Sequence, residues 1–427
     1  MDQGGIMMTY SEETLELLAN GQYEEAKKKF AWALRKDDDD MLYSLAEELY
    51  SLGFSTMSKR AYQKLLERYP NEDGLKTALA DIAIGEGNDD EALTYLADIA
   101  PESEAYVEAL LVSADLYQTQ GMFEVSEQKL LEAYRLAPTE EVIWFALAEF
   151  YYNIKKYEQA TKFYLELIKA GTFELAKVNL VQRLGVAYAS DGHFEQALGY
   201  LEQIPKEKLD PDTSFQLGFT YQQLGKNEEA KKQYSALRET NPDYATLYPA
   251  LAEVLATEGN YAQALITVQE GLGVDEYNPN LYQQAADYAQ KLGQAAKASD
   301  YLKEALALEP DNMTLVLKLS NLYLLLGRDE DNIAFLKRYL ASNESDGQLY
   351  WNLGKAYANL DDYQAALEYY DAAYQELDKN SSFLRDASFF YRNAGQAKQA
   401  LTAVKSYLET NPSDGEMLEL ESELENW

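Results

Sequence analysis

Residues 217–242 read LGFTYQQLGKNEEAKKQYSALRETNP, and the pattern of this stretch recurs along the whole chain. Its central Gly225 belongs to a series of glycines whose adjacent gaps are mostly 32 to 34 residues. The series is Gly21, Gly53, Gly87, Gly121, Gly192, Gly225, Gly259, Gly293, Gly327 and Gly395. Lys155 and Asp361 stand where the period calls for a further glycine. A period near 34 residues indicates an array of similar small units.

Each unit is predicted to hold two amphipathic helices, because apolar residues recur three and four apart on both sides of the glycine. Glycine takes the left-handed conformation without strain, so the first helix should end there. Small residues flank the turn, as Gly218 and Ala230 do in the quoted stretch, and they allow two helix backbones to approach closely. Proline cannot continue a helix, so it should end the second one at Pro70, Pro138, Pro242, Pro310 and Pro412.

This register resembles that of the tetratricopeptide repeat (TPR) family, whose units are helix–turn–helix motifs of 34 residues. The matching residues of one unit are Leu217, Gly218, Tyr221, Gly225, Ala230, Tyr234 and Pro242. Those of another are Trp144, Leu147, Ala148, Tyr151, Tyr157 and Ala160. We place twelve units, which begin near residues 7, 39, 73, 107, 141, 178, 211, 245, 279, 313, 347 and 381. The chain also resembles all-repeat bacterial proteins of Gram-positive type.

The resemblance covers nearly the whole chain and implies an all-α fold, a right-handed solenoid of about 25 helices. Residues 1–8 are expected to form a flexible head and residues 9–412 the twelve units. The register slips near 170–178 and again near 205–211. These slips indicate either a longer helix with an adjusted loop, or a change of superhelical pitch or a hinge.

Residues 413–427 are expected to form a capping helix. Met417, Leu420, Leu424 and Trp427 recur at three, four and three residues and form one apolar stripe. A terminal unit has to cover the apolar face of its neighbour and show a polar side to water. The alternative is that this stripe joins two molecules.

Composition excludes several classes of function. Of the 427 residues 47% are hydrophobic and 26% charged, and the net charge is -36. Such a charge repels nucleic-acid backbones and anionic membrane surfaces. No stretch of eighteen apolar residues occurs and no signal-peptide pattern opens the chain, so we expect no membrane insertion. The chain has no cysteine, which excludes disulfides and thiolate metal sites and is compatible with a cytoplasmic protein.

No catalytic, cofactor or metal site is predicted. The single histidine, His193, falls in a turn beside Gly192, and no nucleophile and acid set surrounds it in sequence. The glycines are single and periodic, so no phosphate-binding loop is present. The run Asp37-Asp38-Asp39-Asp40 is interpreted as a turn with a helix cap, and calcium binding is the alternative. We therefore expect a protein that is not an enzyme.

The resemblance implies a concave groove lined by the first helices, with positions 2, 5, 9 and 12 of each unit facing it. These positions identify candidate partner-binding residues, which we place at Tyr43, Glu47, Tyr50, Asp81, Asp115, Phe145, Glu149, Tyr152, Phe215, Phe219, Trp351, Lys355, Arg385, Phe389 and Arg392. Exposed aromatic and arginine side chains are the usual anchors of a binding surface. The alternative is that the aromatic side chains pack between neighbouring first helices.

The predicted groove changes sign along its length. Its N-terminal half is acidic and should prefer a basic segment of a partner. Its C-terminal end carries Lys355, Arg385 and Arg392 and should hold an acidic segment. The alternative for the two arginines is pairing with nearby acids such as Asp386 and Glu376.

The resemblance thus implies a scaffold or adaptor that binds a protein or peptide. Relatives that bind chaperone tails hold a terminal carboxylate with lysine and asparagine on successive units. Here position 5 is never lysine and position 9 is asparagine only at Asn321, so that mode is not expected. The alternatives are a peptide-responsive signalling regulator and a self-assembling structural array. A homo-oligomer is compatible with the sequence but is not indicated by it.

Overall fold

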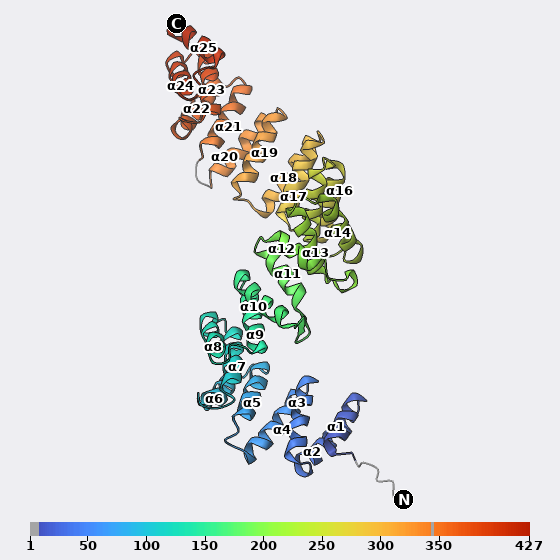
Figure 1. Ribbon diagram of the computed structural model, residues 1–427. Coiled ribbons are helices and arrows are strands. Elements are labelled where there is room, and N and C mark those ends of the chain that lie inside the picture. Colours follow the sequence, from blue (N-terminus) through green and yellow to red (C-terminus); the bar gives the residue numbers. More distant parts are fainter. Residues whose placement is uncertain (1–7, 343–345) are drawn as a thin grey trace, which may run out of the picture. The chain divides into compact units, whose positions relative to one another are not determined.

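The computed structural model describes residues 8–342 and 346–427 and is almost entirely helical (Figure 1). The chain divides into two compact units: unit 1 ends at Lys206 and unit 2 begins at Glu207. This boundary falls inside the second predicted irregular region, 205–211. Apart from Met8, the predicted head lies outside the described residues.

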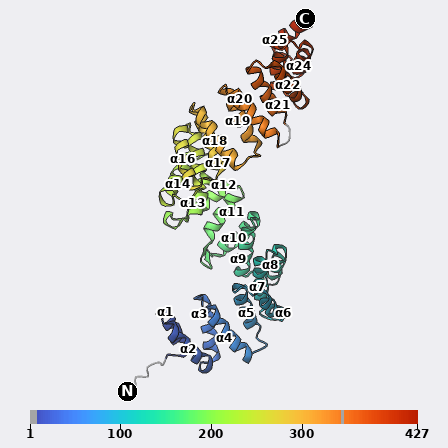
Figure 2. The same cartoon turned by 180° about the vertical axis from the view of Figure 1, so that it is seen from behind.

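Unit 1 is built from alternating first and second helices. Its first helices are α1 (Tyr10–Ala19), α3 (Asp39–Ser51), α5 (Asp73–Gly85), α7 (Tyr106–Thr119), α9 (Glu141–Asn153) and α11 (Leu180–Ser190). Its second helices are α2 (Tyr23–Lys36), α4 (Ser55–Arg68), α6 (Asp89–Ala97), α8 (Phe123–Leu136), α10 (Tyr157–Ala170) and α12 (Phe194–Leu201). Figures 1 and 2 agree that α2, α4, α6 and α8 lie on the outer side of the bend of this unit. The first helices therefore form its inner face.

Unit 2 repeats this alternation after a short 3-10 turn, η1 (Lys206–Lys208), at the boundary. Its first helices are α13 (Pro211–Gln223), α15 (Leu247–Thr257), α17 (Pro279–Lys291), α19 (Met313–Leu325), α21 (Gly347–Asn359) and α23 (Ser381–Asn393). Its second helices are α14 (Asn227–Thr240), α16 (Tyr261–Val274), α18 (Ala295–Leu308), α20 (Asp329–Leu340), α22 (Tyr363–Leu377) and α24 (Ala397–Thr410). A last helix, α25 (Gly415–Glu425), completes the 25 α-helices of the described residues. The predicted helix count is confirmed.

The turn inside every repeat is left-handed. All glycines of the periodic series have φ between 63° and 83°. Lys155 and Asp361, which replace glycine in the series, adopt the same conformation with φ of 61° and 60°. The backbone geometry is thus kept even where the residue that favours it is missing, and those two turns carry strain.

Small residues let the two helices of a repeat pack closely, as the sequence predicts. A Cβ added at Gly218 in α13 would stand 2.6 Å from the ring of Tyr234 in α14. The same relationship joins Gly354 in α21 to Tyr370 in α22, at 2.7 Å. The second helices end where proline requires: α14 ends at Thr240, two residues before Pro242.

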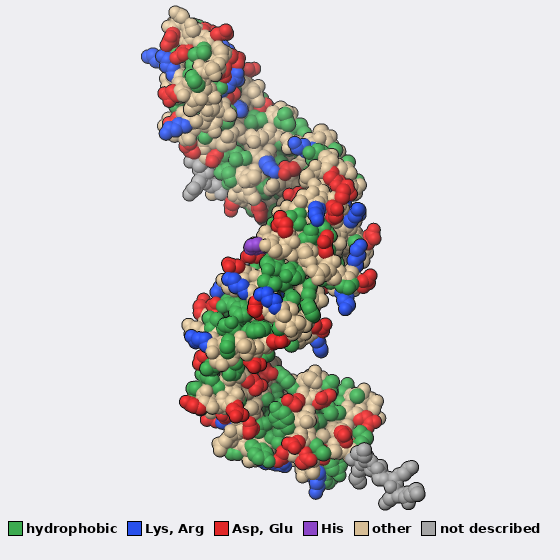
Figure 3. Space-filling model, viewed as in Figure 1, with side chains coloured by type: hydrophobic (Ala, Val, Ile, Leu, Met, Phe, Trp, Pro, Cys, Tyr) green, Lys and Arg blue, Asp and Glu red, His purple; other side chains and the backbone are tan. Residues whose placement is uncertain are grey.

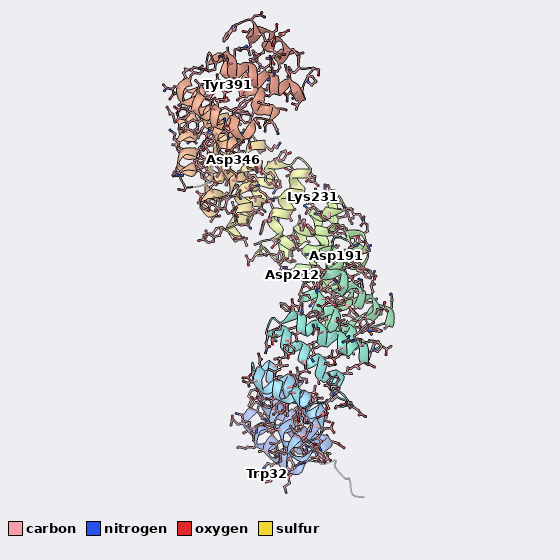
Figure 4. The ribbon with its side chains drawn as sticks, turned by 90° about the vertical axis from the view of Figure 1, so that its left-hand side faces the viewer. Trp32, Asp191, Asp212, Lys231, Asp346 and Tyr391 are labelled. Carbon is pink, nitrogen blue, oxygen red and sulfur yellow. The ribbon has the colours of Figure 1, made fainter. Side chains whose placement is uncertain are left out.

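The tyrosine four residues before the left-handed turn buries its ring at the seam between helices and keeps its hydroxyl bonded. Tyr391, labelled in Figure 4, donates its hydroxyl from α23 to Asp371 in α22 at 2.7 Å. Tyr151 in α9 donates in the same way to Glu127 in α8 at 2.8 Å. A buried tyrosine with a satisfied tip fixes both the packing and the orientation of its helix.

The first irregular region is a hairpin rather than a longer helix. Helix α10 ends at Ala170, is followed by the left-handed C-cap Gly171 with φ 95°, and has 14 residues like α8. Two short strands follow, β1 (Glu174–Leu175) and β2 (Val178–Asn179), and they pair antiparallel. Their turn places Ala176 and Lys177 at positive φ, 48° and 66°. The expectation of a longer helix is therefore wrong, because the extra residues pair with each other outside α10.

The last helix, α25, packs as the expected cap on three of its four predicted apolar residues. Met417, Leu420 and Leu424 are buried against α24 and its neighbours. Trp427 differs, since it lies beyond the end of the helix and is 67% exposed. The helical stripe stops at Glu425, so the predicted fourth member does not join the core.

Candidate functional site

One pair of positions recurs on the first helices. We count both from the left-handed residue that ends each first helix: position −6 lies six residues before it and position −9 lies nine residues before it. The predicted groove residues Glu47, Asp81, Asp115, Glu149 and Lys355 all occupy position −6.

A side chain at position −6 pairs with position −9 of the next first helix. Four such pairs occur in the described chain: Glu149–Arg183 at 3.4 Å, Asp287–Lys318 at 2.8 Å, Asn321–Asn352 at 2.9 Å and Lys355–Asp386 at 3.9 Å. The pairing connects neighbouring repeats and tolerates either direction of charge. We call a polar side chain at position −6 closed where its −9 partner is present.

Three successive carboxylates of unit 1 lack this partner. They are Glu47 in α3, Asp81 in α5 and Asp115 in α7, which we call the open carboxylates. Alanine or valine occupies position −9 of the following helices, at Ala78, Val112 and Ala146. In the part of the chain that the structure describes, no basic side chain forms an ion pair with any of the three. Figure 3 shows acidic and hydrophobic side chains intermixed over α5 and α7.

Two carboxyl groups on α7 respond to the acidic side chains of α3 and α5. Glu108 and Asp115 on α7 are exposed, yet the protein around them raises the pKa of both carboxyl groups by desolvation. Asp81 raises both pKa values further, and Glu47 adds to the effect on Glu108. The effect of Asp81 and Glu47 on these pKa values indicates that acidic side chains of α3, α5 and α7 lie near one another.

Tyrosine side chains stand beside the open carboxylates. Tyr43 and Tyr50 on α3 are 41% and 37% exposed. Tyr43 meets the buried Tyr62 of α4 edge to face, with ring centroids 5.7 Å apart. Burial raises the pKa of the Tyr50 hydroxyl, and so does its hydrogen bond to Asp81. This part of the inner face thus combines exposed rings with uncompensated negative charge.

The α9 end of the inner face is closed by the chain itself. The Tyr164 hydroxyl donates to Glu149, and the Arg183 guanidinium approaches the same carboxylate at 3.4 Å. Arg183 also lies over the ring of Tyr152, 4.6 Å from its centroid. Glu149 and Tyr152, both predicted as partner-binding residues, are therefore already engaged by an internal arginine.

Two predicted aromatic residues, Phe145 and Phe215, are packed between helices. Phe145 packs against the core formed by α7 to α11. Phe215 stacks on Phe219 at 6.4 Å and contacts the rings of Tyr234 and Tyr244 at 5.6 and 5.7 Å. For Phe145 and Phe215 the structure agrees with the alternative of interhelical packing, whereas the stacking of Phe219 on Phe215 lies within one helix, α13.

Trp351 is a correction to the sequence analysis. It is only 7% exposed, so its ring does not lie open as a cover for a partner's side chain. Its indole N–H donates to Asp386 at 2.5 Å, and the Tyr370 hydroxyl donates to the same oxygen at 2.7 Å. Lys355 lies over the Trp351 ring at 3.7 Å, and burial lowers the pKa of its ammonium group. Lys355, at position −6 of α21, is therefore closed by Asp386 on α23.

The two C-terminal arginines pair with the last helix. Arg385 forms ion pairs with Glu416 and with Asp414, the latter at 3.7 Å. Arg392 pairs with Glu423 at 3.7 Å. The alternative of internal pairing is right in kind, but the acids come from α25 and its N-cap rather than from Asp386 and Glu376. Phe389 lies between the two guanidinium groups, 5.4 Å from each.

The sequence analysis missed Tyr62 and Arg183. Tyr62 belongs to a second helix, and only first helices were expected to line the groove. Arg183 stands in the unit whose register is shifted by the hairpin, where counting from the unit start fails. Counting back from the left-handed residue would have found both members of each −6 and −9 pair.

The structure places the predicted turn residues His193 and Asp38 at helix starts. His193 lies at the start of α12, half exposed, with Nδ1 3.0 Å from Asp191. Within the described residues no group of three or more histidine, aspartate or glutamate side chains could hold a metal ion. The Asp38 carboxylate caps α3 by accepting from the backbone N–H of Met41, as the turn interpretation predicts. None of the helices in residues 8–342 and 346–427 has the length and apolar character needed to cross a membrane.

Comparisons with known proteins agree with this geometry. Family models of tetratricopeptide repeats match residues 215–279 and 289–357. Models described as YpiA-like tetratricopeptide repeats and YpiA-like C-terminal tetratricopeptide repeats match residues 118–172 and 347–414. The fold and its repeats thus define a TPR protein.

A full-length relative narrows the class. The chain is 33% identical over 416 residues to the "TPR repeat-containing protein YpiA" of Bacillus subtilis, and the match covers 97% of both chains. The chain therefore belongs to the YpiA-like family of TPR proteins. It is also 24% identical to the "Protein CTR9 homolog" of Arabidopsis thaliana, over 67% of this chain and 28% of that protein. A solved chain of the APC/C hetero-tetramer Cut9–Hcn1 has a TM-score of 0.38 at 14% identity, and the match covers 97% of this chain and 96% of that one.

Proposed function

We propose that this protein is a non-catalytic scaffold or adaptor that binds a protein or peptide on the inner face of unit 1. The observation that carries the proposal is the set of three open carboxylates, Glu47, Asp81 and Asp115, beside exposed tyrosine rings. A basic segment would gain charge pairing there without competing against a basic side chain of the described chain. Exposed tyrosine supplies contact area at low entropic cost.

Membership of the TPR family supports a binding role, since TPR proteins are generally protein-interaction scaffolds. The support for a binding surface on unit 2 is weaker. An acidic segment bound near Arg385 and Arg392 would have to replace the carboxylates of Glu416 and Glu423. Binding of an acidic segment at that end stays a prediction, and unit 1 is the first surface to test.

The test is affinity capture from a bacterial lysate with identification of the retained protein by mass spectrometry. We expect Glu47→Lys with Asp81→Lys to lose the partner that the unaltered chain retains, because both changes turn attraction into repulsion. The matched control is Glu25→Lys with Glu124→Lys, which reverses two exposed carboxylates of the outer helices α2 and α8. Equal retention by both double variants, with folding intact by circular dichroism, would reject the inner face of unit 1 as the binding surface.

A further inference from the structure

Unit 1 already contains one occupied arginine site. Its members are Glu149 and Tyr152 on α9, Tyr164 on α10, and the bound side chain of Arg183 on α11. The carboxylate pairs with the guanidinium, the Tyr152 ring lies under it, and the Tyr164 hydroxyl orients the carboxylate. This arrangement shows what the fold builds around a guanidinium group at these positions.

The same set of side chains occurs three repeats earlier. Glu47, Tyr50 and Tyr62 each lie 102 residues before Glu149, Tyr152 and Tyr164. Tyr43 stands 102 residues before Phe145, so a ring is kept at a fourth position. Helices α3 and α4 have the lengths of α9 and α10, and the same left-handed turn joins each pair, so the two sets occupy the same positions of their repeats.

The two sets differ in their occupant. Arg183 stands nine residues before the left-handed Gly192, and Ala78 stands nine residues before the left-handed Gly87. The side chain of Ala78 carries no positive charge that could pair with Glu47. The first set therefore has the carboxylate and the rings of an arginine site, without the arginine.

We propose that Tyr43, Glu47, Tyr50 and Tyr62 bind an arginine side chain from an extended segment of a partner protein. This inference rests on the proposed function and names the chemistry of the partner. The guanidinium group of the partner's arginine occupies the position that Arg183 has in the later set. Its N–H donors point toward the Glu47 carboxylate, and its planar face stacks on the Tyr50 ring. Asp81 lies near the Tyr50 hydroxyl, whose pKa it helps to raise.

The open carboxylates also set the spacing of the partner's cations. Packed helices lie about 8–10 Å apart. An extended chain advances about 3.3 Å per residue. A segment that crosses α3, α5 and α7 therefore meets a new carboxylate about every third residue. We infer that the partner carries a basic residue at every third position, with arginine opposite Glu47.

Arginine fits this place better than lysine. Its planar guanidinium stacks on a tyrosine ring and offers parallel N–H donors to one carboxylate. An ammonium group has no plane to stack and keeps its hydration more strongly. The inner face of unit 1 itself holds arginine at the occupied set.

The probes are fluorescein-labelled peptides with blocked ends, measured by fluorescence anisotropy against the full chain. One peptide has arginine at every third position, with glycine and serine between. Its three comparisons carry lysine at the same positions, citrulline at the same positions, or the same arginines placed side by side. We expect the spaced arginine peptide to bind several-fold tighter than the lysine and side-by-side peptides, and the citrulline peptide not to saturate.

Two variants test the set itself. Glu47→Gln keeps the shape of the side chain and should weaken the spaced arginine peptide about tenfold. Ala78→Arg should fill the set from within, as Arg183 fills the later one, and should weaken the same peptide without removing a carboxylate. Glu25→Gln on α2 is the matched control and should leave binding unchanged. Thermal melts by circular dichroism confirm that each variant folds.

The outcomes separate this inference from the proposed function. Equal binding of the arginine and lysine peptides, or no effect of Glu47→Gln, would overturn the arginine site. The proposed function would still stand if Glu47→Lys with Asp81→Lys lost the captured protein. If the spaced peptide binds and that capture is unaffected by charge reversal, the arginine site is supported and the captured protein binds elsewhere. If neither peptide binding nor capture responds to changes on this face, both proposals fail.

Discussion

Lys318 on α19 approaches both carboxylate oxygens of Asp287 on α17 at 2.8 Å, across the contact between two successive repeats. This pair shows the −6 and −9 relationship in its simplest form. It links helices that are neighbours in space and 31 residues apart in sequence. In the described part of unit 2, pairs of this kind join α17 to α19, α19 to α21 and α21 to α23, whereas the three successive carboxylates of unit 1 stay open.

We expect the Asp287–Lys318 pair to act as a reversible contact between repeats. Lys318→Asp places two carboxylates together and should lower the free energy of unfolding by about 1 kcal/mol, a small value because both side chains are partly exposed. Adding Asp287→Lys restores opposite charges and should recover most of the loss. Urea denaturation of the single and double variants measures both effects, and a double variant as unstable as the sum of its single changes would contradict the pairing.

Replacing Lys155 by glycine should relieve strain in its turn and stabilise the protein. A side chain at φ 61° crowds the backbone, and glycine removes that crowding. We expect Lys155→Gly to raise the free energy of unfolding by up to about 1 kcal/mol after the added freedom of the unfolded chain is subtracted. Lys155→Ala keeps a Cβ in the left-handed turn and is the control. A gain of equal size for alanine would show that loss of charge, not relief of the turn, is responsible.

Two glycines of α16 allow a matched test of close packing. A Cβ at Gly271 would stand 2.6 Å from the Cβ of Tyr248, whereas a Cβ at Gly273 meets no atom within 4 Å. Gly271→Ala should therefore cost about 1–3 kcal/mol through overpacking. Gly273→Ala should be neutral or should stabilise the helix by up to about 1 kcal/mol. Chemical denaturation compares the two, and similar costs would refute the packing argument.

The inner face of unit 1 should oppose folding more strongly as pH rises. Burial and the neighbouring Asp81 raise the folded-state pKa of Glu108 and Asp115 above the ordinary values of 4.5 and 3.8. The folded chain then holds these protons more tightly than the unfolded chain. Their contribution to stability is fully present below the ordinary carboxyl pKa values and is lost as pH rises through the raised values. Denaturation between about pH 4 and pH 7 should show this loss.

The matched variant for this pH effect is Glu108→Gln with Asp115→Asn, which should flatten the dependence over the same range. Asp73→Asn is the control of opposite sign, because the hydrogen bond from Lys76 lowers the pKa of Asp73 and its contribution disappears only at lower pH. Binding of a basic peptide should weaken as pH falls toward the same carboxyl values. An unchanged slope in the double variant would locate the pH effect elsewhere.

The last helix should behave as a cap rather than as a dimer contact. Leu420 is buried, so Leu420→Ala should lower the free energy of unfolding by about 2–4 kcal/mol. Trp427 is exposed, so Trp427→Ala should have almost no effect on stability. Light scattering distinguishes the alternative: if either change, or deletion of residues 413–427, converts a dimer into a stable monomer, the stripe joins two molecules.

The architecture could be predicted from the sequence because the residues within each repeat determine its turn and the ends of its helices. Gly225 fixes the turn and Pro242 ends the second helix, and no distant residue is needed to decide either. The hairpin at β1 and β2 could not be predicted in this way. Its turn uses Ala176 and Lys177 at positive φ, and neither residue type announces such a conformation.

The binding face was only partly readable, because charge compensation depends on neighbours in space. Glu47 and Glu149 look alike in sequence, and only the contact with Arg183 shows that one of them is engaged. Burial of Trp351 likewise depends on Asp386, which lies on the next first helix. The sequence predicts which positions could face inward, and the contacts between repeats decide which of those side chains are already paired.

The −6 and −9 positions give this fold a simple evolutionary freedom. Because Ala78, Val112 and Ala146 lie at the surface of a helix contact rather than in the turn, a cation can arise there by point mutation while the repeat keeps its glycine and its proline. Each new cation at position −9 would pair with one carboxylate and remove it from the binding surface. Loss of a cation at position −9 of another repeat would leave a different carboxylate unpaired. Proteins that descend from one ancestral array can thus change their binding partners one repeat at a time, while the residues that determine the fold stay the same.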